Sequence, residues 1–484
     1  MRNLFCWLKI IALLLPISVA AADKRPFNEV YRPQFHFTPE ENRMGEPAGL
    51  VWIDGEYHLF YVYNPFGLDN IFSYWGHAVS TDLLHWEHLP LALTPDRGKS
   101  RDPEFGNNLP GSVLVDRKNF SGLQQGEEPV ILAFYTSRMY GQCMAYSRDK
   151  GRSWTKYEGN PLIPFDPENQ TCHPKVFWSE AGRHFVMMLS RQPGGDDSRQ
   201  GLSFYSSENL TDWTFESHLP GFQECSELVE LPVEGRAGET CWILFERSGS
   251  WFAGSFDGRR FIPGSPRMQS DFGANYQAPK CWSNLPEADG RIVSIAWMRG
   301  GTYPDMPFNG QLSFPCELSL KAVPEGFRLE RRPVRELENL LGKGMKVEGK
   351  TVIPGLNKNP LKGVKEDCLY IRGTFVLNKL SSFGFLLRHG RDQNGTEIRY
   401  DATKNVLSFL GCSAGLLPEN GKLSLTILMD RSSVEIFGRE GQPVISSCFV
   451  PEPESREVLL YNTGGELDIE RLEVFPVRSV YPEK

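Results

Sequence analysis

The stretch Asp54-Gly-Glu-Tyr-His-Leu-Phe-Tyr61 is the first of five short β-rich runs that recur along this chain. The later runs end at Tyr135, Leu189, Glu246 and Met298. A strand-like segment precedes each run, and the first four runs lead through a Ser-x-Asp-like turn to an aromatic residue. Strands at short, even spacing, in units of about four, are typical of β-propeller blades. Five units predict five blades, whereas a solenoid, the alternative, has repeats of roughly 20–45 residues.

The first strand of each propeller blade lines the central channel, so the residues that open these strands should meet at one end of it. They are Glu46, Gly111, Ser112, Cys172, His173, Glu224, Cys225 and Tyr276. A lone acid at a strand start is more often a solvated turn residue than a catalytic group. Glu46 and Glu224, however, hold parallel positions in the repeat. Glycosidic hydrolysis commonly uses two such carboxyl groups, which makes this pair the candidate catalytic centre.

The N-terminus has the order of a cleaved export signal. Arg2 and Lys9 are followed by an apolar run over residues 10–19 and then by small residues before Asp23. The run is too short to span a bilayer of roughly 30 Å, although an uncleaved anchor is the alternative. Residues 1–22 are therefore predicted to be a signal peptide, with export to the periplasm or the extracellular medium. No later stretch is apolar enough to predict a membrane span in the mature chain.

Charge and cysteine content narrow the class of partner. The formal charge of −8 becomes −10 when Arg2 and Lys9 leave with residues 1–22, which contain no acids. An acidic body without a basic stripe argues against nucleic acid or an anionic membrane and fits a neutral substrate. The 10 cysteines are irregularly spaced, without the paired clusters of structural zinc sites. We expect no cofactor and no metal, and mostly buried thiols, with a disulfide or two as the alternative.

The residue pattern along the chain changes after residue 325. We predict a propeller over residues 25–325, a charged helical or irregular connector over 326–345 and a β-sandwich over 346–480. Alternating apolar runs separated by Gly and Asn turns support the sandwich. The fold class is therefore all-β in two domains.

Five motifs occur in order along nearly the whole mature chain. They are Tyr31-Arg-Pro-Gln-Phe-His-Phe-Thr38, Trp75-Gly-His-Ala78, Ser80-Thr-Asp-Leu-Leu-His-Trp86, Glu224-Cys225 and Asp430-Arg-Ser-Ser-Val-Glu-Ile-Phe-Gly438. Together they resemble glycoside hydrolase family 32, which contains invertases, inulinases and levanases. This family joins a five-bladed propeller to a β-sandwich, so the resemblance implies the architecture that the repeats predict.

The catalytic motifs of that family match this chain only in part. The motif W-M-N-D-P-N-G, with its nucleophilic aspartate, aligns with Arg43-Met-Gly-Glu-Pro-Ala-Gly49, which places Glu46 at the nucleophile position. The R-D-P triplet, whose aspartate resembles a transition-state stabiliser, has become Cys172-His173-Pro174. The acid/base motif E-C stands as Glu224-Cys225. A second string, Arg101-Asp102-Pro103, lies at the wrong place in its blade and is interpreted as a surface loop.

The resemblance implies a retaining hydrolase of fructan-like or related furanosides that acts on an oligo- or polysaccharide. Glu46 would be the nucleophile, His173 would occupy the stabiliser position, and Glu224 would be the acid/base, its pKa raised by burial and a neighbouring carboxylate. Polar positions expected to hold a fructosyl ring are replaced, so we expect low efficiency on sucrose. The predicted substrate-binding residues are Trp75, Ser112, Cys172, Cys225, Tyr276 and Trp282, the aromatic ones as stacking walls or as core.

Three other interpretations stay open at the level of sequence. The chain could be an impaired family member that binds oligosaccharides without cutting them, although two acids at the catalytic positions speak mildly against this. It could also be a hydrolase for a different sugar. Finally, Cys172, His173, Glu224 and Cys225 could bind a soft metal, or His173 could activate Cys172 as a nucleophile. The simpler reading of these cysteines is two half-buried thiols.

Overall fold

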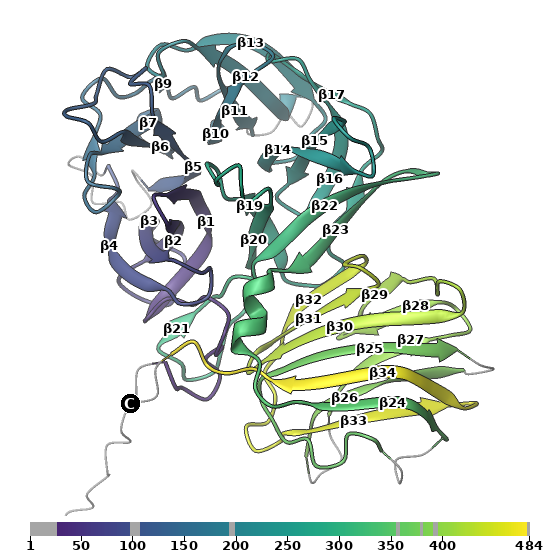
Figure 1. Ribbon diagram of the computed structural model, residues 1–484. Coiled ribbons are helices and arrows are strands. Elements are labelled where there is room, and N and C mark those ends of the chain that lie inside the picture. Colours follow the sequence, from purple (N-terminus) through teal and green to yellow (C-terminus); the bar gives the residue numbers. More distant parts are fainter. Residues whose placement is uncertain are drawn as a thin grey trace, which may run out of the picture.

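The computed structural model describes residues 27–96, 107–192, 199–354, 359–377, 381–390 and 395–481, without the side chains of Cys225 and Ser226. The predicted signal peptide and the Arg101-Asp102-Pro103 string lie outside these residues. The described chain is built almost entirely from β-strands in two domains, a propeller and a sandwich, which confirms the predicted fold class (Figure 1). None of the described helices is long and apolar enough to cross a membrane.

The propeller contains five blades of antiparallel strands, each beginning at the centre of the ring (Figure 1). Blade 1 consists of β1 (Asn42–Ile53), β2 (Glu56–Asn64), β3 (Tyr74–Ser80) and β4 (Glu87–Leu93). Blade 2 consists of β5 (Asn108–Asp116), β6 (Val130–Ser137), β7 (Gly141–Ser147), β8 (Thr155–Lys156) and β9 (Ile163–Pro164). Blade 3 consists of β10 (Thr171–Ser179), β11 (His184–Arg191), β12 (Gly201–Ser207) and β13 (Thr214–Pro220).

Blades 4 and 5 complete the ring. Blade 4 consists of β14 (Cys225–Glu234), β15 (Thr240–Glu246), β16 (Ser250–Phe256), β17 (Phe261–Pro263) and β18 (Met268–Gln269). Blade 5 consists of β19 (Tyr276–Cys281), β20 (Ile292–Met298), β22 (Cys316–Val323) and β23 (Gly326–Pro333). Between β20 and β22, the short strand β21 (Phe308–Asn309) pairs in parallel with β1. A late segment of the propeller therefore joins the first blade and helps to close the ring.

The repeated turns have a clear structural purpose. In the first two blades a serine hydroxyl bonds the aspartate two residues later, at Ser80 and Ser147. The tryptophan that follows donates its indole N–H to a carbonyl in the same turn, at 3.1 Å for Trp86 and 3.0 Å for Trp154. In blade 3 the serine of this turn is Ser207, whose hydroxyl bonds Asn209. Each turn thus fixes a large aromatic side chain between blades.

The prediction of a connector over residues 326–345 is wrong in its first half. Residues Gly326–Pro333 form β23, which pairs antiparallel with β22 as an outer strand of blade 5. Its charges are neutralised by ion pairs, because Glu330 lies 2.9 Å from Arg328 and 2.6 Å from Arg332. Buried Arg331 is paired with Asp271 at 2.9 Å. Only the second half is a true connector, which contains the 3-10 helix Arg335–Leu340.

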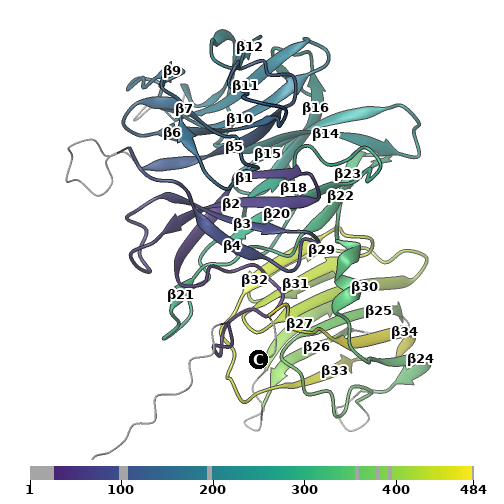
Figure 2. The same ribbon diagram turned by 60° about the vertical axis from the view of Figure 1, so that its left-hand side comes forward.

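The C-terminal domain packs two antiparallel sheets face to face, alongside the propeller (Figure 2). One sheet contains β24 (Met345–Val352), β34 (Leu467–Pro476), β25 (Leu369–Leu377), β30 (Lys422–Asp430), β31 (Ser433–Gly438) and β32 (Val444–Cys448). The other contains β29 (Cys412–Gly415), β28 (Val406–Phe409), β27 (Thr396–Asp401), β26 (Ser382–His389) and β33 (Glu457–Thr463). Alternate residues such as Leu423, Leu425 and Ile427 enter the shared core. The period of two along these strands is the alternation that predicts a sandwich.

Two buried histidines in blade 1 make the stability of the fold depend on pH. Nδ1 of His58 lies 3.0 Å from Nε2 of His77, beside Gly151 of the neighbouring blade, and both rings are fully enclosed. Burial lowers the pKa of His58 to about 4 and that of His77 well below its ordinary value. Because the unfolded chain takes up these protons first, the free energy of unfolding should fall as pH drops below about 6.5.

For His58 the loss should reach about 3 kcal/mol near pH 4, at about 1.4 kcal/mol for each pKa unit. Denaturant titrations at several pH values measure this loss. A His77→Gln variant, which cannot take up a proton at that position, should show a shallower decline. Equal declines in the variant and the wild type between pH 6.5 and 4.5 would contradict the assignment.

Candidate active site

Each first strand of the propeller departs from regular pairing where it opens into the channel. The register with the second strand shifts between Met44 and Gly49 in blade 1 and between Cys172 and Lys175 in blade 3. Similar shifts occur at the starts of β5, β14 and β19. Such β-bulges redirect side chains and are common beside active sites. In blades 1 and 3 the bulged segments contain Glu46 and His173.

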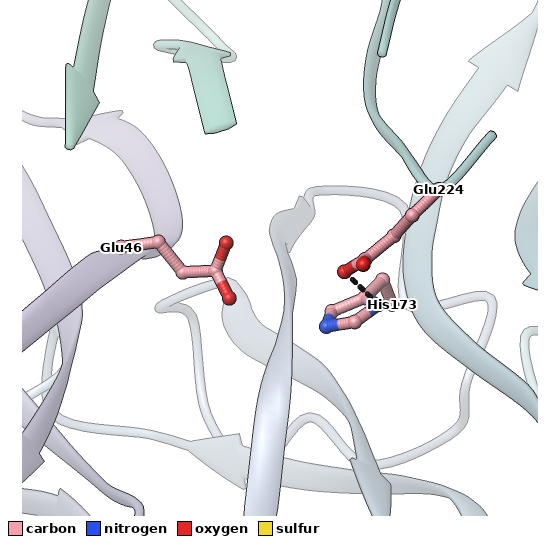
Figure 3. A group of neighbouring side chains, drawn as sticks. All are labelled: Glu46, His173 and Glu224. Carbon is pink, nitrogen blue, oxygen red and sulfur yellow. Dashed lines mark ion pairs between the residues drawn. The ribbon is translucent and has the colours of Figure 1, made fainter. Parts of the chain in front are cut away.

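Three polar side chains meet at this end of the channel. Figure 3 shows Glu46 and Glu224 reaching toward each other, with His173 beside Glu224. One ligand atom from each of the three residues lies within 4.8 Å of the others. Glu46 lies in the bulge of β1, His173 lies in the bulge of β10 at a left-handed φ of 57°, and Glu224 immediately precedes β14. The structure thus brings together the residues whose parallel repeat positions the sequence analysis singles out.

Glu224 is surrounded by nitrogen atoms. Nε2 of Gln192 donates to Oε2 at 2.9 Å, and Nη1 of Arg247 donates to Oε2 at 3.1 Å and to Oε1 at 3.3 Å. Nδ1 of His173 lies 3.0 Å from Oε1, at ion-pair distance but without good hydrogen-bond geometry. Both oxygens of the Glu224 carboxylate therefore accept hydrogen bonds in the free site.

Arg247 also contacts the second carboxylate. Its Nη2 donates to Oε1 of Glu46 at 3.2 Å, so one guanidinium bridges Glu46 and Glu224. Sequence reasoning missed both Arg247 and Gln192. For Arg247, the hairpin register was the available signal: Cys225 pairs with Glu246, so the next residue, Arg247, lies opposite Glu224.

The charge state of the site differs from the expected one. Burial raises the pKa of Glu224, but the charge that His173 carries when protonated, the charge of Arg247 and the hydrogen bonds from Gln192 and Arg247 outweigh it and lower the pKa below its ordinary value. The prediction of a raised pKa is therefore wrong for the substrate-free site. Burial also lowers the pKa of His173, despite the nearby carboxylates, so His173 is neutral at pH 7.

The hypothesis that Cys172 acts as a nucleophile or as a metal ligand is not supported by the structure. Cys172 is buried, and this burial raises the pKa of its thiol far above neutral pH, which removes the thiolate that a nucleophile requires. The described side chains that approach one another as a metal-ligating set are Glu46, His173 and Glu224, without Cys172. All eight cysteines with described side chains are free thiols, six of them buried. The predicted role of Cys225 lies outside the described side chains.

The predicted aromatic walls belong to the protein core. Trp75 is fully buried and its indole N–H points to the carbonyl of Leu109. Trp282 is 3% exposed, and its indole N–H donates to the carbonyl of His58. Tyr276 is buried under the guanidinium of Arg331, which lies 3.9 Å from its ring centre. The prediction that these rings stack on a sugar is therefore wrong, because none of them presents a free face.

Ser112 joins two blades. Its hydroxyl donates to the carbonyl of Pro174 at 2.9 Å and accepts from the backbone N–H of Val176 at 2.8 Å. Both partners lie on β10, close to His173. The hydroxyl is thereby committed to the scaffold, and the predicted sugar contact at Ser112 is replaced by a supporting role for the His173 segment.

Comparison with known proteins gives consistent matches over both domains. The model of the glycosyl hydrolases family 32 N-terminal domain matches residues 36–333, and that of the family 32 C terminal domain matches residues 336–476. A levanase of Bacillus subtilis (strain 168) is 38% identical, with 97% of this chain and 74% of the levanase covered. An extracellular exo-inulinase of Aspergillus awamori is 28% identical, with 94% of this chain and 96% of that protein covered. The crystal structure of exo-inulinase from Aspergillus awamori superposes with a TM-score of 0.84 at 27% identity, over 94% of this chain and 100% of that one.

Proposed function

Because this chain belongs to glycosyl hydrolases family 32, we propose that it is an exported hydrolase that cleaves fructan-like or related furanoside linkages by a retaining mechanism. The levanase and exo-inulinase relatives support a fructan substrate, and the extracellular exo-inulinase supports export. The observation that carries the mechanism is the separation of the carboxylates. One oxygen atom of Glu46 and one of Glu224 lie within 4.8 Å of each other, a proximity that fits the roughly 5–5.5 Å between the carboxyl groups of retaining enzymes.

In the first step, an oxygen of Glu46 attacks the anomeric carbon while the glycosidic C–O bond breaks. Glu224, in its protonated form, gives its proton to the leaving oxygen. The sugar is then held as an ester on Glu46. In the second step, Glu224 removes a proton from water, the resulting hydroxide attacks the anomeric carbon, and Glu46 leaves as a carboxylate. After both steps, Glu46 is again a carboxylate and Glu224 is again protonated.

His173 has a different task from the charged stabiliser of the family motif. As a neutral imidazole it offers one N–H donor and one acceptor beside Glu224, rather than a negative charge. We propose that it binds a sugar hydroxyl and orients Glu224. Because a neutral donor replaces a carboxylate that would grip two hydroxyls, sucrose should be a poor substrate.

The decisive experiment is a glycan panel of levan, inulin, sucrose and other furanosides, tested with the wild type, Glu224→Gln and the exposed control Glu208→Gln. We expect Glu224→Gln to lower turnover on the best substrate by about 100-fold or more, the usual contribution of a general acid/base. The control should match the wild type. Transfer of the sugar to methanol should give a methyl glycoside of retained configuration, as measured by NMR. Inverted product, or unchanged turnover in Glu224→Gln, would contradict the proposal.

A second candidate function has one specific observation in its favour. Arg247 pairs with both carboxylates, as would suit a protein that binds oligosaccharides without cutting them. Calorimetry on the same panel separates the two. Binding without product release over long incubation would support the binding function, whereas release that depends on Glu224 would exclude it.

A further inference from the structure

We propose that Arg247 is a positioning residue that bridges Glu46 and Glu224 and keeps Glu224 ionised while no sugar is bound, and that an entering sugar displaces it from Glu224 so that this carboxylate can take up the catalytic proton. The proposal rests on the proposed hydrolase function. It assigns to the arginine the control of when Glu224 becomes an acid.

The contacts of Arg247 suit a bridge that can open. Its backbone N–H donates to the carbonyl of Glu224 at 2.7 Å, and its carbonyl accepts from the N–H of Ala278 at 2.7 Å. These bonds anchor the main chain to blades 4 and 5. The side chain, in contrast, is 32% exposed, while those of Glu46 and Glu224 are 11% and 16% exposed. The side chain of Arg247 is therefore more accessible than those of the two carboxylates that it bridges.

The hydrogen bonds of Glu224 explain what movement of Arg247 would change. Oε2 accepts N–H groups from both Gln192 and Arg247, and Oε1 accepts one from Arg247. An oxygen that accepts two N–H groups has no direction left in which to donate a proton to a leaving group. Departure of Arg247 removes one hydrogen bond from each oxygen and so frees Glu224 to act as an acid. Arg247 is the donor with a second partner available, because its Nη2 can stay on Glu46, which must remain ionised to attack.

Charge balance leads to the same conclusion. With His173 neutral, Arg247 is the cation in contact with both carboxylates among the described residues. Without it, two carboxylates within 4.8 Å would repel each other, which favours proton uptake by one of them. Removal of Arg247 should therefore produce a proton-bearing pair in the free protein.

The pH profile of Arg247→Met tests the proposal. In the wild type, the basic limb of kcat/KM, which reports the free protein, should lie at lower pH than the basic limb of kcat, which reports the complex. In Arg247→Met the kcat/KM limb should move up by about one pH unit or more and approach the kcat limb. Arg247→Lys should move it less. The control is Arg259→Met, which removes an exposed pair with Glu216 in the same domain.

A titration without substrate separates this inference from the proposed function. Carbon-13 NMR of labelled glutamate carboxyls, assigned with Glu224→Gln, should show Glu224 titrating at higher pH in Arg247→Met than in the wild type. If no glycan is cleaved but this shift occurs, the control of ionisation stands and the hydrolase function falls. If turnover is present but neither the limb nor the carboxyl titration moves, the function stands and the inference is overturned. A Glu224 that is protonated at neutral pH in the free wild type would also overturn it.

Discussion

Replacing Glu46 by glutamine is expected to lower turnover on the best substrate by about 10⁴-fold or more, because the ester intermediate can no longer form and members of one catalytic unit cannot replace each other. The carboxylate is 11% exposed, its Oε1 is held by Nη2 of Arg247, and it lies within 4.8 Å of Glu224. Steady-state rates at the pH optimum of each variant measure the loss. Glu41→Gln, an exposed neighbour on the same segment, is the matched control.

A second substitution of Glu46 tests whether the site requires the length of a glutamate side chain. Glu46→Asp shortens the side chain and withdraws the oxygen by roughly 1 Å from Arg247 and Glu224, a misplacement that costs about 100-fold. We therefore expect a loss, although the sequence resemblance aligns Glu46 with an aspartate. A gain in turnover would show that the site is adapted to aspartate, and turnover within tenfold of the wild type in Glu46→Gln would remove Glu46 as nucleophile.

The repeat pattern carried most of the information on the fold. Strand runs and turns at regular spacing predict blades, and the first-strand position of a residue then predicts that it lies at the channel. Glu46, His173 and Glu224 could be grouped by this rule, because each opens a first strand. The sequence pattern did not predict the strand at residues 326–333, because the high density of charge there suggested a connector. Glu330 and its arginine neighbours pair with one another, so the charges are compatible with a strand in blade 5.

What sequence could not predict depends on contacts made after the strands pair. Burial alone would raise the pKa of Glu224, and that part of the expectation has the right physical sign. The outcome is reversed by His173, on the first strand of blade 3, and by Arg247, which reaches Glu224 through the β14–β15 register. The tryptophans show the same limit. Trp75 and Trp282 have the chemistry of sugar platforms, but their indole groups bond carbonyls inside the propeller.

Asp430 is expected to be the strongest single link between the two domains. It ends β30 in the sandwich, is fully buried and accepts the backbone N–H groups of Gln34, Phe35 and His36, at 2.7, 3.0 and 3.2 Å. It also pairs with Nδ1 of His36 at 2.8 Å. Asp430→Asn removes the charge and turns an N–H₂ group toward these donors. Breaking a buried pair of this kind costs about 3–5 kcal/mol.

Denaturant unfolding of Asp430→Asn beside the exposed control Asp305→Asn measures this cost. The pH dependence identifies its origin. Burial lowers the pKa of His36, but hydrogen bonds and charges from Asp430 and Glu435 outweigh it and raise the pKa to about 9. Because the folded value lies above the unfolded value of about 6.5, this contribution to stability is complete below that pH and is lost as pH rises through about 9. Asp430→Asn should therefore be most destabilising at acidic to neutral pH and less so above pH 9. An unfolding free energy within about 1 kcal/mol of the wild type at pH 6 would mean that the domains are held chiefly by their apolar contact, in which Phe35 and Phe314 of the propeller share a core with Leu428 and Phe437 of the sandwich.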